Sequence, residues 1–519
     1  MIRLFNANCR LAIACIAQAA IIFMAIGVPN KGWTQSAPPQ IGTGLPNLGD
    51  STSITPAAER RLGDRIAREL YRDPDYLDDA VIGEYVQSIW LPLMAAARAR
   101  GELPPELDAQ YAWRVLLGRD RSVNAFALPG AYFGVHLGLV GIVTSRDELA
   151  AVLAHELSHV TQRHIARLIT RQSEQAPWMI GAMILGALAA SKSPGAANAL
   201  IVGGQAVAAQ TQLNFSRDME READRVGFGI AGQAGFAPQG FVSMFEKLQQ
   251  SSRLNDAGGF PYLRSHPLST ERMADMQARI PSPVAAPPPA SVDGEHPVIA
   301  ARARVLSNPA VDALRHWVQE AEPARLVRQP AALQAGVLYA ATLAASRLRS
   351  FDQTDALSQR LREAAGSDAQ AARQVRLLLA EIALVRDNAA QALVELGPQW
   401  SSRSRAELFL AVQAQLALGR ADVASQSLQT WVADNPGDAQ AWQWLARTAA
   451  AQGRTVASIR AEAEVNIAQL DYAAALARLK AAQDMARSNP KAGDHFEASI
   501  VDTRARQVEQ LLREQALER

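Results

Sequence analysis

Residues 145–171 read SRDELAAVLAHELSHVTQRHIARLITR, and this stretch decides the fold of the first half of the chain. It begins with a capping box, in which Ser145 is followed three residues later by Glu148, a common start of an α-helix. The residues that follow favour one continuous helix as far as about Arg171. Because strand-like segments precede this long capped helix, the pattern indicates an α+β domain.

The predicted helix carries the pentapeptide HELSH, which begins at His155 and ends at His159. Two helical positions four residues apart differ in direction by about 40°, so both imidazoles can reach one metal ion at about 2.0–2.1 Å. Glu156 points beside the metal rather than at it, where its carboxylate can act as a base toward water. His164 falls on the opposite face of the same helix, and we expect it to be an ordinary surface or packing histidine.

A catalytic zinc needs a third protein ligand. The two cysteines of the chain, Cys9 and Cys15, both lie near the N-terminus, so thiolate metal sites, disulfide frameworks and cysteine nucleophiles are excluded from the rest of the sequence. The third ligand must therefore come from His, Asp or Glu.

The best candidate for that ligand is Glu220, within residues 215–227 (FSRDMEREADRVG). On a helix, Glu220 shares a face with Asp224 and with two small residues, Ala223 and Gly227, which would let this helix approach the histidine helix closely. Asp224 is placed to accept the free ring N–H of a ligand histidine and so to fix its tautomer. The alternative is a solvated charged helix without a metal role.

Two helical and three strand-like segments precede the histidine helix, and each strand is bounded by Gly, Pro, Asn or Asp. The predicted helices are Ala57–Leu70 and Ala80–Arg98, and the predicted strands are Tyr111–Leu117, Ala125–Leu128 and Tyr132–Val140. We expect Tyr132–Val140 to be an exposed edge strand that binds a substrate backbone by strand addition.

Two residues downstream are candidates for the chemistry of peptide cleavage. His266, in Ser265-His266-Pro267, has no evident structural role on a loop. It could stabilise the tetrahedral oxyanion or cap the metal in a resting state. Arg272 is a second candidate for the oxyanion.

The N-terminus predicts export. Arg3 and Arg10 precede an apolar run, Leu11–Val28, and small residues follow. We therefore assign residues 1–37 to a signal peptide and residues 38–54 to a linker. An uncleaved membrane anchor is the alternative, because eighteen apolar residues could just span a bilayer.

The predicted protease domain covers residues 55–280, and a proline-rich linker follows at 281–298. Residues 299–519 read as helix almost throughout, with turn signals about 34 residues apart, a period typical of tetratricopeptide-type helix pairs. These signals are Ser350-Phe351-Asp352, Arg386-Asp387-Asn388, Gly419-Arg420 and Gly453-Arg454. The fold class is thus an α+β domain followed by an all-α repeat domain, and a generic helical bundle is the alternative for the second part.

Charge and hydropathy limit the partners. Lys plus Arg (52) nearly balances Asp plus Glu (51), and this net charge of +1 provides no field that would attract nucleic acid. Residues 178–209 contain two apolar runs, each too short to span a bilayer. We interpret them as a helical hairpin beside the active-site cleft, which could be a lid or an element that contacts a membrane peripherally.

Taken together, these motifs resemble those of the gluzincin metallopeptidases of the HtpX and CAAX-prenyl-protease type. The resemblance covers about residues 55–280 and rests on residues 124–130 (NAFALPG), 155–159 (HELSH), 220–224 and 266–267. One departure is Ala131, at a place where the family often has a second glycine.

The resemblance implies a zincin-type (gluzincin) metalloprotease domain with one zinc ion per chain. It implies that His155, His159 and Glu220 hold the zinc, that Glu156 is the catalytic base and that Asp224 has a supporting or proton-donating role.

The export signal and the repeats make the chain most similar to the periplasmic branch of that family, whose members carry C-terminal tetratricopeptide repeats. This similarity implies work in the periplasm on outer-membrane proteins, assisting their assembly and degrading misfolded or stalled ones. The repeat domain would bind these clients and their assembly machinery. One alternative is a chaperone or scaffold with latent proteolysis, in which His266 occupies the open metal position. Another is an interaction protein with an inactive site, which predicts no stoichiometric zinc.

Overall fold

The computed structural model describes residues 54–172, 216–254, 260–280, 294–398, 400–488 and 495–516. The predicted signal peptide, nearly all of the linker after it and the apolar stretch 178–209 lie outside the described residues. Residues 51–519 cluster into one compact unit.

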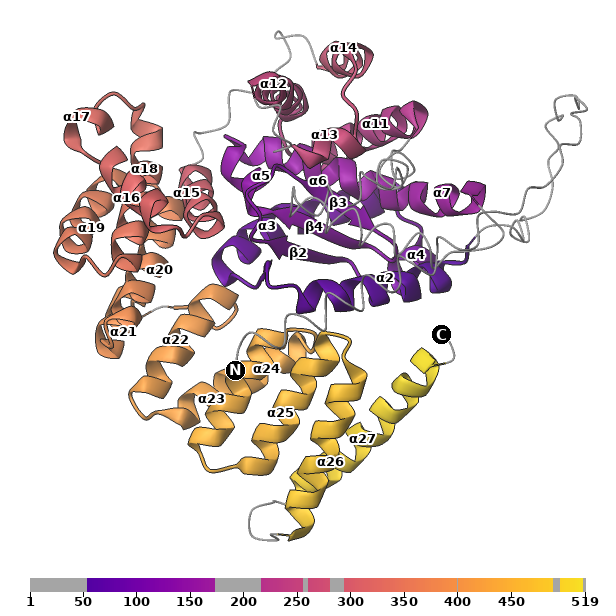
Figure 1. Cartoon of the computed structure of the whole chain (residues 1–519), viewed down its shortest axis with the longest axis vertical. Helices are drawn as coiled ribbons and strands as arrows, with labels where there is room; N and C mark the ends of the chain where they lie inside the picture. Colours follow the sequence, from indigo (N-terminus) through magenta and orange to yellow (C-terminus); the bar gives the residue numbers. More distant parts are fainter. Residues whose placement is uncertain are drawn as a thin grey trace, which may run out of the picture. The chain divides into compact units, whose positions relative to one another are not determined.

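A four-stranded sheet lies at the centre of the first half of this unit (Figure 1). Its strands are β1 (Tyr76–Leu77), β2 (Arg114–Gly118), β3 (Ala125–Leu128) and β4 (Tyr132–His136), in the spatial order β1-β2-β4-β3. β2 and β4 are parallel, whereas β1 pairs with β2 and β3 pairs with β4 in antiparallel fashion.

The predicted edge strand is an interior strand. β4 is paired on both sides, all five of its residues are buried, and it ends at His136, where the short helix α5 (Leu137–Ile142) begins. The prediction of an exposed strand over Tyr132–Val140 is therefore wrong. The reason is that a run of buried apolar residues does not distinguish a strand from the buried helix that continues it. Within the described residues β3 pairs with β4 alone, so β3 is the edge strand on this side of the sheet.

Helices surround the sheet, and several begin at side-chain caps that the sequence provides. They are α2 (Pro56–Arg72), α3 (Ala80–Ala99), α4 (Pro105–Gln110), α6 (Arg146–Thr161), α7 (His164–Gln172), α11 (Arg217–Gln233), α12 (Gln239–Leu254), α13 (Pro261–Ser265) and α14 (Thr270–Arg279). The predicted cap at Ser145 is present, because its side chain accepts the amide of Glu148 at 3.2 Å.

Helix α3 combines length and hydropathy in a way that, among the described residues, would allow it alone to cross a membrane. Much of it is buried: Trp90 is 1% exposed and lies 4.5 Å, centroid to centroid, from Phe133 of β4. It also packs against α6, α11 and α22 (Arg405–Ala417). The contacts are those of a core helix.

The histidine helix is broken, contrary to the prediction of one helix to Arg171. α6 ends at Thr161 and α7 begins at His164, because Arg163 takes a left-handed conformation with φ of 52°. The Arg163 side chain is anchored, since its Nη2 donates to the carbonyl of Ile54 at 2.6 Å. The same nitrogen lies 3.2 Å from Oε2 of the buried Glu59.

The turn between β3 and β4 packs tightly on α2. A Cβ on Gly63 would lie 2.0 Å from the Pro129 carbonyl oxygen, so only glycine permits this approach. Gly130 and Ala131 both have positive φ, 71° and 61°. Ala131 thus adopts in this chain a conformation that favours glycine.

The C-terminal half is a succession of helices that pack on their neighbours in sequence. They are α15 (Glu295–Ser307), α16 (Val311–Glu320), α17 (Pro323–Leu326), α18 (Ala331–Arg347), α19 (Phe351–Ala365), α20 (Ala369–Val385), α21 (Ala389–Leu396), α22, α23 (Ala421–Asp434), α24 (Ala439–Ala451), α25 (Thr455–Ala468), α26 (Tyr472–Ser488) and α27 (His495–Ala516). Three of the four predicted turn signals fall between two helices, and in the fourth Ser350 precedes α19, which begins at Phe351. The assignment to tetratricopeptide repeats stays a prediction.

Helix α15 joins the two halves. It begins at Glu295, within the predicted linker, and packs against α3, α5 and α18. The imidazole of His296, 1% exposed, accepts the Tyr85 hydroxyl at Nδ1 (2.6 Å) and donates from Nε2 to the Val143 carbonyl (2.9 Å). The start of α15 is therefore packed into the core beside α3 and α5.

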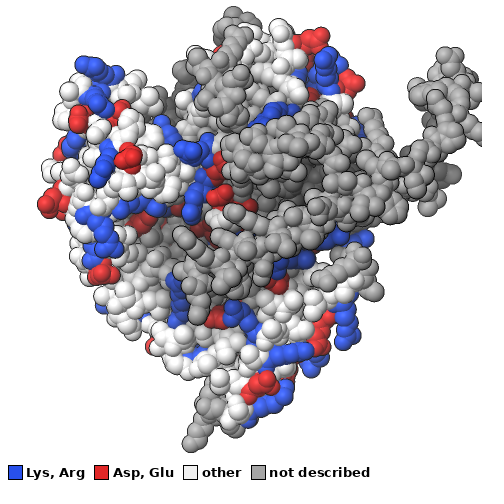
Figure 2. Space-filling model, in the orientation of Figure 1, with Lys and Arg blue, Asp and Glu red and all other residues white. Residues whose placement is uncertain are grey.

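Arginines from the C-terminal helices pair with acids just before α3. Arg302 of α15 binds Asp79 with two nitrogens, and its Nη2 lies 2.7 Å from Oδ2. Arg405 of α22 lies 2.7 Å from Asp78. Elsewhere on the visible face, basic and acidic side chains are interspersed (Figure 2).

Candidate metal centre

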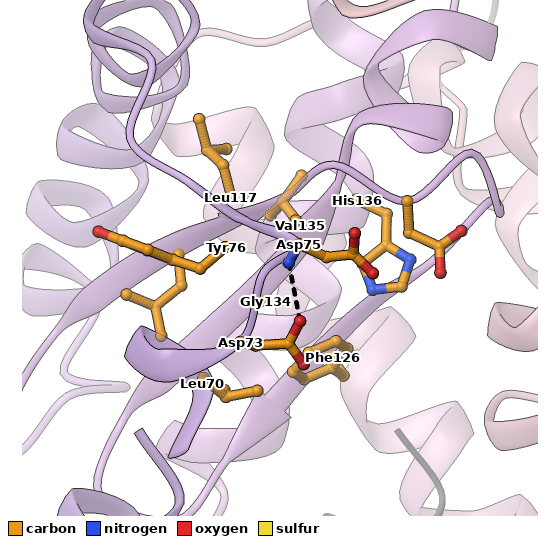
Figure 3. Close-up of a pocket in the computed structure, with 12 residues that line it drawn as sticks. Leu70, Asp73, Asp75, Tyr76, Leu117, Phe126, Gly134, Val135 and His136 are labelled. Carbon is orange, nitrogen blue, oxygen red and sulfur yellow. Dashed lines mark hydrogen bonds between the residues drawn. The ribbon is translucent and has the colours of Figure 1, made fainter. Parts of the chain in front are cut away.

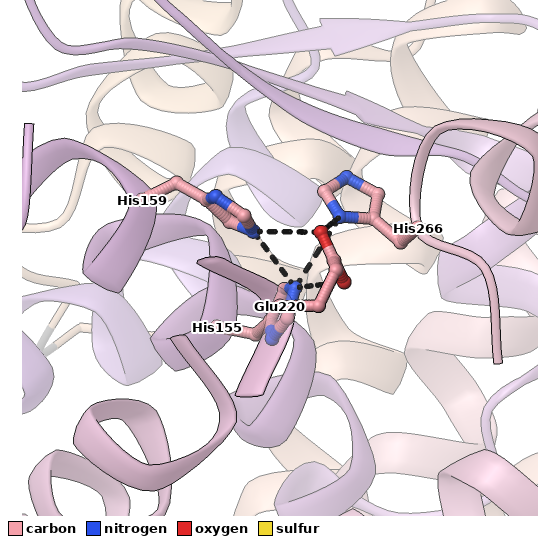
Figure 4. A group of neighbouring side chains, drawn as sticks. All are labelled: His155, His159, Glu220 and His266. Atoms are coloured by element: carbon pink, nitrogen blue, oxygen red, sulfur yellow. Dashed lines mark hydrogen bonds and ion pairs between the residues drawn. The ribbon is translucent and has the colours of Figure 1, made fainter. Parts of the chain in front are cut away.

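Four buried side chains converge on one point (Figure 4): His155 and His159 from α6, Glu220 from α11 and His266 just after α13. One ligand atom from each lies within 4.8 Å of all the others, and none of the four residues is more than 2% exposed. The structure thus brings together the three predicted ligands and one predicted catalytic residue, from three separate elements.

The distances fit a single ion. Nε2 of His155 lies 3.0 Å from Nε2 of His159 and 3.5 Å from a Glu220 oxygen. Nε2 of His159 lies 3.5 Å from the other oxygen of Glu220. Ligands on a tetrahedral zinc at about 2.0–2.1 Å are separated by about 3.3 Å. Two imidazoles and one carboxylate are also the donor set of a catalytic zinc.

Helix packing makes this convergence possible. Ala223, on the inner face of α11, is fully buried, and a Cβ added to Gly227 would lie 3.0–3.1 Å from the backbone of Ala154 and His155. The two small residues therefore let α11 approach α6 closely, as their spacing in the sequence suggests.

Glu156 lies beside the ligands with a buried carboxylate. It is 1% exposed, and among the described residues no side chain donates a hydrogen bond to its oxygens. The backbone amide of Ala127 is its hydrogen-bond partner. His266 Nε2 lies 3.4 Å from its Oε1. Burial raises the pKa of Glu156, against the opposing charges of His266 and His155. A buried carboxylate of raised pKa with free acceptor sites suits a general base.

Asp224 lies behind His155. Its Oδ1 is 3.0 Å from Nδ1 of His155, the ring nitrogen that faces away from the other ligands. Although burial opposes ionisation, hydrogen bonds from Arg272 and His155 lower the pKa of Asp224. An ionised Asp224 placed here fixes the His155 tautomer that offers Nε2 to a metal.

Arg272, like Asp224, supports the ligand residues from behind. Its Nε and Nη2 donate to the two oxygens of Asp224 at 2.6 and 2.8 Å, and its Nη1 lies 2.8 Å from Glu220. Nη1 also donates to the carbonyl of Pro267 at 2.8 Å. Because all three nitrogens are engaged, the structure places Arg272 in the position of a carboxylate clamp and not of the predicted oxyanion donor.

His266 lies among the ligand atoms. Its Nδ1 is 3.0 Å from Oε1 of Glu220 and 3.3 Å from Nε2 of His155. The ring of Tyr262 stacks on it at 4.7 Å. This position fits the predicted metal cap.

His164 does not lie on the face opposite the ligand histidines, where the sequence placed it. It is fully buried, and its Nδ1 lies 2.9 Å from Nδ1 of His159. Burial lowers the pKa of His164 to about 4. The prediction is wrong because it assumed an unbroken helix, whereas the left-handed Arg163 turns the next residue back toward the site. No local pattern in the sequence signals that break.

The true edge strand borders the site. α6 packs against β3. The amide of His136 donates to the carbonyl of Asn124 at 3.0 Å, so in the antiparallel pattern the polar groups of Ala125 and Ala127 point away from β4. The backbone amide of Ala127 also donates a hydrogen bond to Glu156, which lowers the pKa of that carboxyl group and so opposes the effect of burial. The edge that the sequence assigned to Tyr132–Val140 is thus supplied by β3.

A separate small pocket lies over the sheet (Figure 3). It is lined by residues that include Asp73, Phe126, Gly134 and His136, and the amide of Asp75 donates to Asp73 beside it at 2.8 Å. None of the residues that line it belongs to the ligand group.

The sequence of this region matches a known family. The model of "Peptidase family M48" matches residues 84–280, a range that contains all four converging residues. Residues 84–280 form a family M48 peptidase domain. Family M48 consists of metal-dependent proteases, so the M48 domain confirms the predicted metallopeptidase and agrees with its buried His/Glu group.

Relatives of known name agree with this. The chain is 31% identical over 322 residues to the "Putative beta-barrel assembly-enhancing protease" of Vibrio cholerae, a match that covers 61% of this chain and 63% of that protein. It is 28% identical over 434 residues to the "Beta-barrel assembly-enhancing protease" of Escherichia coli, covering 81% of this chain and 83% of the relative. The "Mitochondrial metalloendopeptidase OMA1" of Saccharomyces cerevisiae is 27% identical over 38% of this chain and 55% of its own length.

These similarities confirm the resemblance that the motifs indicated, and they confirm a metalloendopeptidase. The chain covers slightly less than two thirds of the Vibrio relative, and the similarity to OMA1 is confined to a shorter stretch.

Proposed function

We propose that this chain is a zinc-dependent endopeptidase of the bacterial cell envelope that acts on outer-membrane β-barrel proteins during their assembly. The observation that carries the peptidase part is the convergence of His155, His159 and Glu220 beside the buried carboxylate of Glu156. The names of the Vibrio and Escherichia relatives, which refer to β-barrel assembly, support the client class and the envelope location.

The site residues divide the chemistry among them. When bound, zinc supplies Lewis-acid polarisation of a peptide carbonyl and acidification of water. Glu156 takes a proton from the attacking water at its carboxylate and delivers it to the leaving amine, a role for which its raised pKa is suited. Asp224 and Arg272 hold the ligands His155 and Glu220 in place.

The substrate backbone would add to β3. The outward polar groups of Ala125 and the carbonyl of Ala127 can pair with an extended peptide, and because the Ala127 amide is hydrogen-bonded to Glu156, the peptide would lie beside that carboxylate. The Val123 carbonyl, at the far end of this edge, already accepts the Tyr262 amide at 3.3 Å, so the open edge is short. Such a site requires an extended segment and favours unfolded or stalled chains over folded ones.

The test compares wild type, Glu156→Gln and Glu271→Gln for metal content and for hydrolysis of casein. Glu271 is an exposed acid paired with Arg221 and serves as the matched control. We expect about one zinc per chain in all three proteins, and a loss of cleavage of about 10²–10⁴-fold in Glu156→Gln alone. Wild type without stoichiometric zinc, or full activity in Glu156→Gln, would contradict the proposal.

A second candidate is a chaperone or scaffold for outer-membrane protein assembly with latent proteolysis. The position of His266 among the ligand atoms favours it, because a fourth protein ligand would fill the place that a substrate carbonyl needs. If Glu156→Gln supports maturation of a β-barrel client as well as wild type does, binding matters more than cleavage. If maturation fails, the peptidase activity is required.

The remaining predictions on partners belong to the same proposal. The C-terminal helices would bind clients and their assembly machinery, residues 178–209 would contact a membrane peripherally, and the N-terminal 37 residues would direct export to the periplasm.

A further inference from the structure

The ring nitrogen of His155 that faces away from the other ligands lies against a carboxylate, that of Asp224, whereas the corresponding nitrogen of His159 lies against another imidazole. Nδ1 of His159 lies 2.9 Å from Nδ1 of His164, whose Nε2 lies 3.0 Å from Oε2 of Glu222. Arg167 donates to the same carboxylate oxygen at 2.6 Å. His159, His164 and Glu222 thus form a row of hydrogen-bonded side chains. The row begins at the fully buried imidazole of His159 and ends at the carboxylate of Glu222, whose side chain is 40% exposed.

The hydrogens in this row can be placed in one order only. If Nε2 of a neutral His159 binds a metal, the ring hydrogen is on Nδ1, and this N–H must donate to Nδ1 of His164. The hydrogen of His164 is then on Nε2 and donates to Glu222, which accepts only. The other tautomer of His164 would set two N–H groups against each other at 2.9 Å and would leave the carboxylate without a donor.

We propose that His164, oriented by Glu222, is a positioning residue that selects the tautomer of His159 able to bind the metal. The inference rests on the proposed metallopeptidase function. Metal-binding histidines usually donate their second ring N–H to a carboxylate, a backbone carbonyl or water. Here a second imidazole, carried by a different helix, has this place.

The backbone supports this role. Arg163 stabilises the break between α6 and α7 through its hydrogen bonds to Ile54 and Glu59. The break places the ring of His164 next to that of His159. Because His164 lies on α7 and Glu222 on α11, these hydrogen bonds also connect two helices that both contact α6.

Four variants of the full chain test the proposal. His164→Leu removes the acceptor, whereas His164→Asn keeps an acceptor oxygen at about the place of Nδ1. Glu222→Ala removes the exposed end of the row, and Glu271→Ala removes an exposed acid of α14 that pairs with Arg221 on α11. The first measurement is zinc affinity, by competition with a chelator on metal-free protein.

We expect His164→Leu to weaken zinc binding by about 10–100-fold, the range typical of such outer partners. His164→Asn should restore most of the affinity, Glu222→Ala should weaken binding less than His164→Leu, and Glu271→Ala should match wild type. A side chain that only fills space would show the reverse order for the first two variants, because leucine replaces the buried volume of the ring better than asparagine does.

A second measurement does not depend on bound metal. Nitrogen NMR of histidine-labelled, metal-free protein reports which ring nitrogen of His159 carries the hydrogen, and we expect the Nδ1–H form to lose population in His164→Leu. If His164→Leu fails to fold, Glu222→Ala and His164→Asn carry the test.

The outcomes separate this inference from the proposed function. Wild-type affinity and an unchanged His159 tautomer in both His164→Leu and Glu222→Ala would overturn the inference alone. Wild type without zinc would overturn the proposed function itself.

Discussion

His266 is the residue at which the two proposed functions diverge. Its Nδ1 lies among the ligand atoms, 3.0 Å from Glu220 and 3.3 Å from His155, so it competes with substrate for the fourth position. We expect His266→Ala to raise casein hydrolysis by about tenfold, which corresponds to a resting-state preference of about 1.4 kcal/mol. A fall of about 10²–10³-fold would instead identify His266 as an oxyanion donor.

Arg272 holds two buried carboxylates, Asp224 and Glu220. Removing one partner of a buried ion pair costs about 3–5 kcal/mol, because the remaining charge is left unpaired. We therefore expect Arg272→Ala to lower the free energy of unfolding by about that amount and to weaken zinc binding. Arg272→Lys should recover little, since an ammonium group cannot bind the Asp224 carboxylate with two nitrogens. Thermal unfolding and chelator competition measure both effects, and a lysine variant equal to wild type would contradict the clamp.

For individual residues, the sequence predicted those positions in the site that depend only on the geometry of a single helix. The spacing of His155 and His159, and the shared face of Glu220 and Asp224, follow from 3.6 residues per turn, and the structure brings these residues together. His164 escaped prediction because one left-handed residue between two helices invalidates the helical projection.

Among the elements, the contact between α6 and α11 determines the spacing of the ligands. A methyl group at Gly227 would lie 3.0–3.1 Å from the α6 backbone, closer than ordinary contact, so α11 must move away by a few tenths of an ångström. We expect Gly227→Ala to weaken zinc binding several-fold through the shift of Glu220.

The matched control is Gly232→Ala on the same helix, where a Cβ meets nothing within 4 Å. That change should leave zinc affinity unaltered and should stabilise the helix by about 0.5–1 kcal/mol. Equal zinc affinity in both alanine variants would show that the spacing of α6 and α11 does not limit the site.

The order of the strands in the sheet could not be predicted from the sequence. β3 and β4 were predicted close to their observed starts, but the parallel pairing of β2 with β4 depends on contacts between segments distant in sequence. The boundary between β4 and α5 was missed because the apolar run continues through it.

For the whole molecule, buried ion pairs at the starts of α3 and α24 make stability depend on pH. The Arg302 guanidinium outweighs burial and lowers the pKa of Asp79, just before α3. Arg405 does the same for Asp438, which lies 2.8 Å from it just before α24. A carboxylate whose pKa is lower in the folded state stabilises the fold above its unfolded pKa of about 3.9, and this stabilisation is lost as the pH falls below that value.

We therefore expect the melting temperature to fall steeply as the pH drops below about 4, and to fall less steeply in Asp79→Asn. Asparagine keeps the capping bond to the Ile82 amide but has no charge to lose. Thermal unfolding at several pH values measures this, and parallel curves for the two proteins would contradict the assignment.

His296 and Arg302 of α15 bind the Val143 carbonyl and Asp79, both in the first half of the chain, and this has a consequence for how the two halves are held together. Because α15 packs on α3 and α5 of the first half as well as on α18 of the second, covalent continuity between α14 and α15 is not what keeps the two halves joined. Two polypeptides divided at that connection and produced in the same cell should reassemble by complementation. Either one alone would expose an apolar surface with unpaired charges and should be degraded.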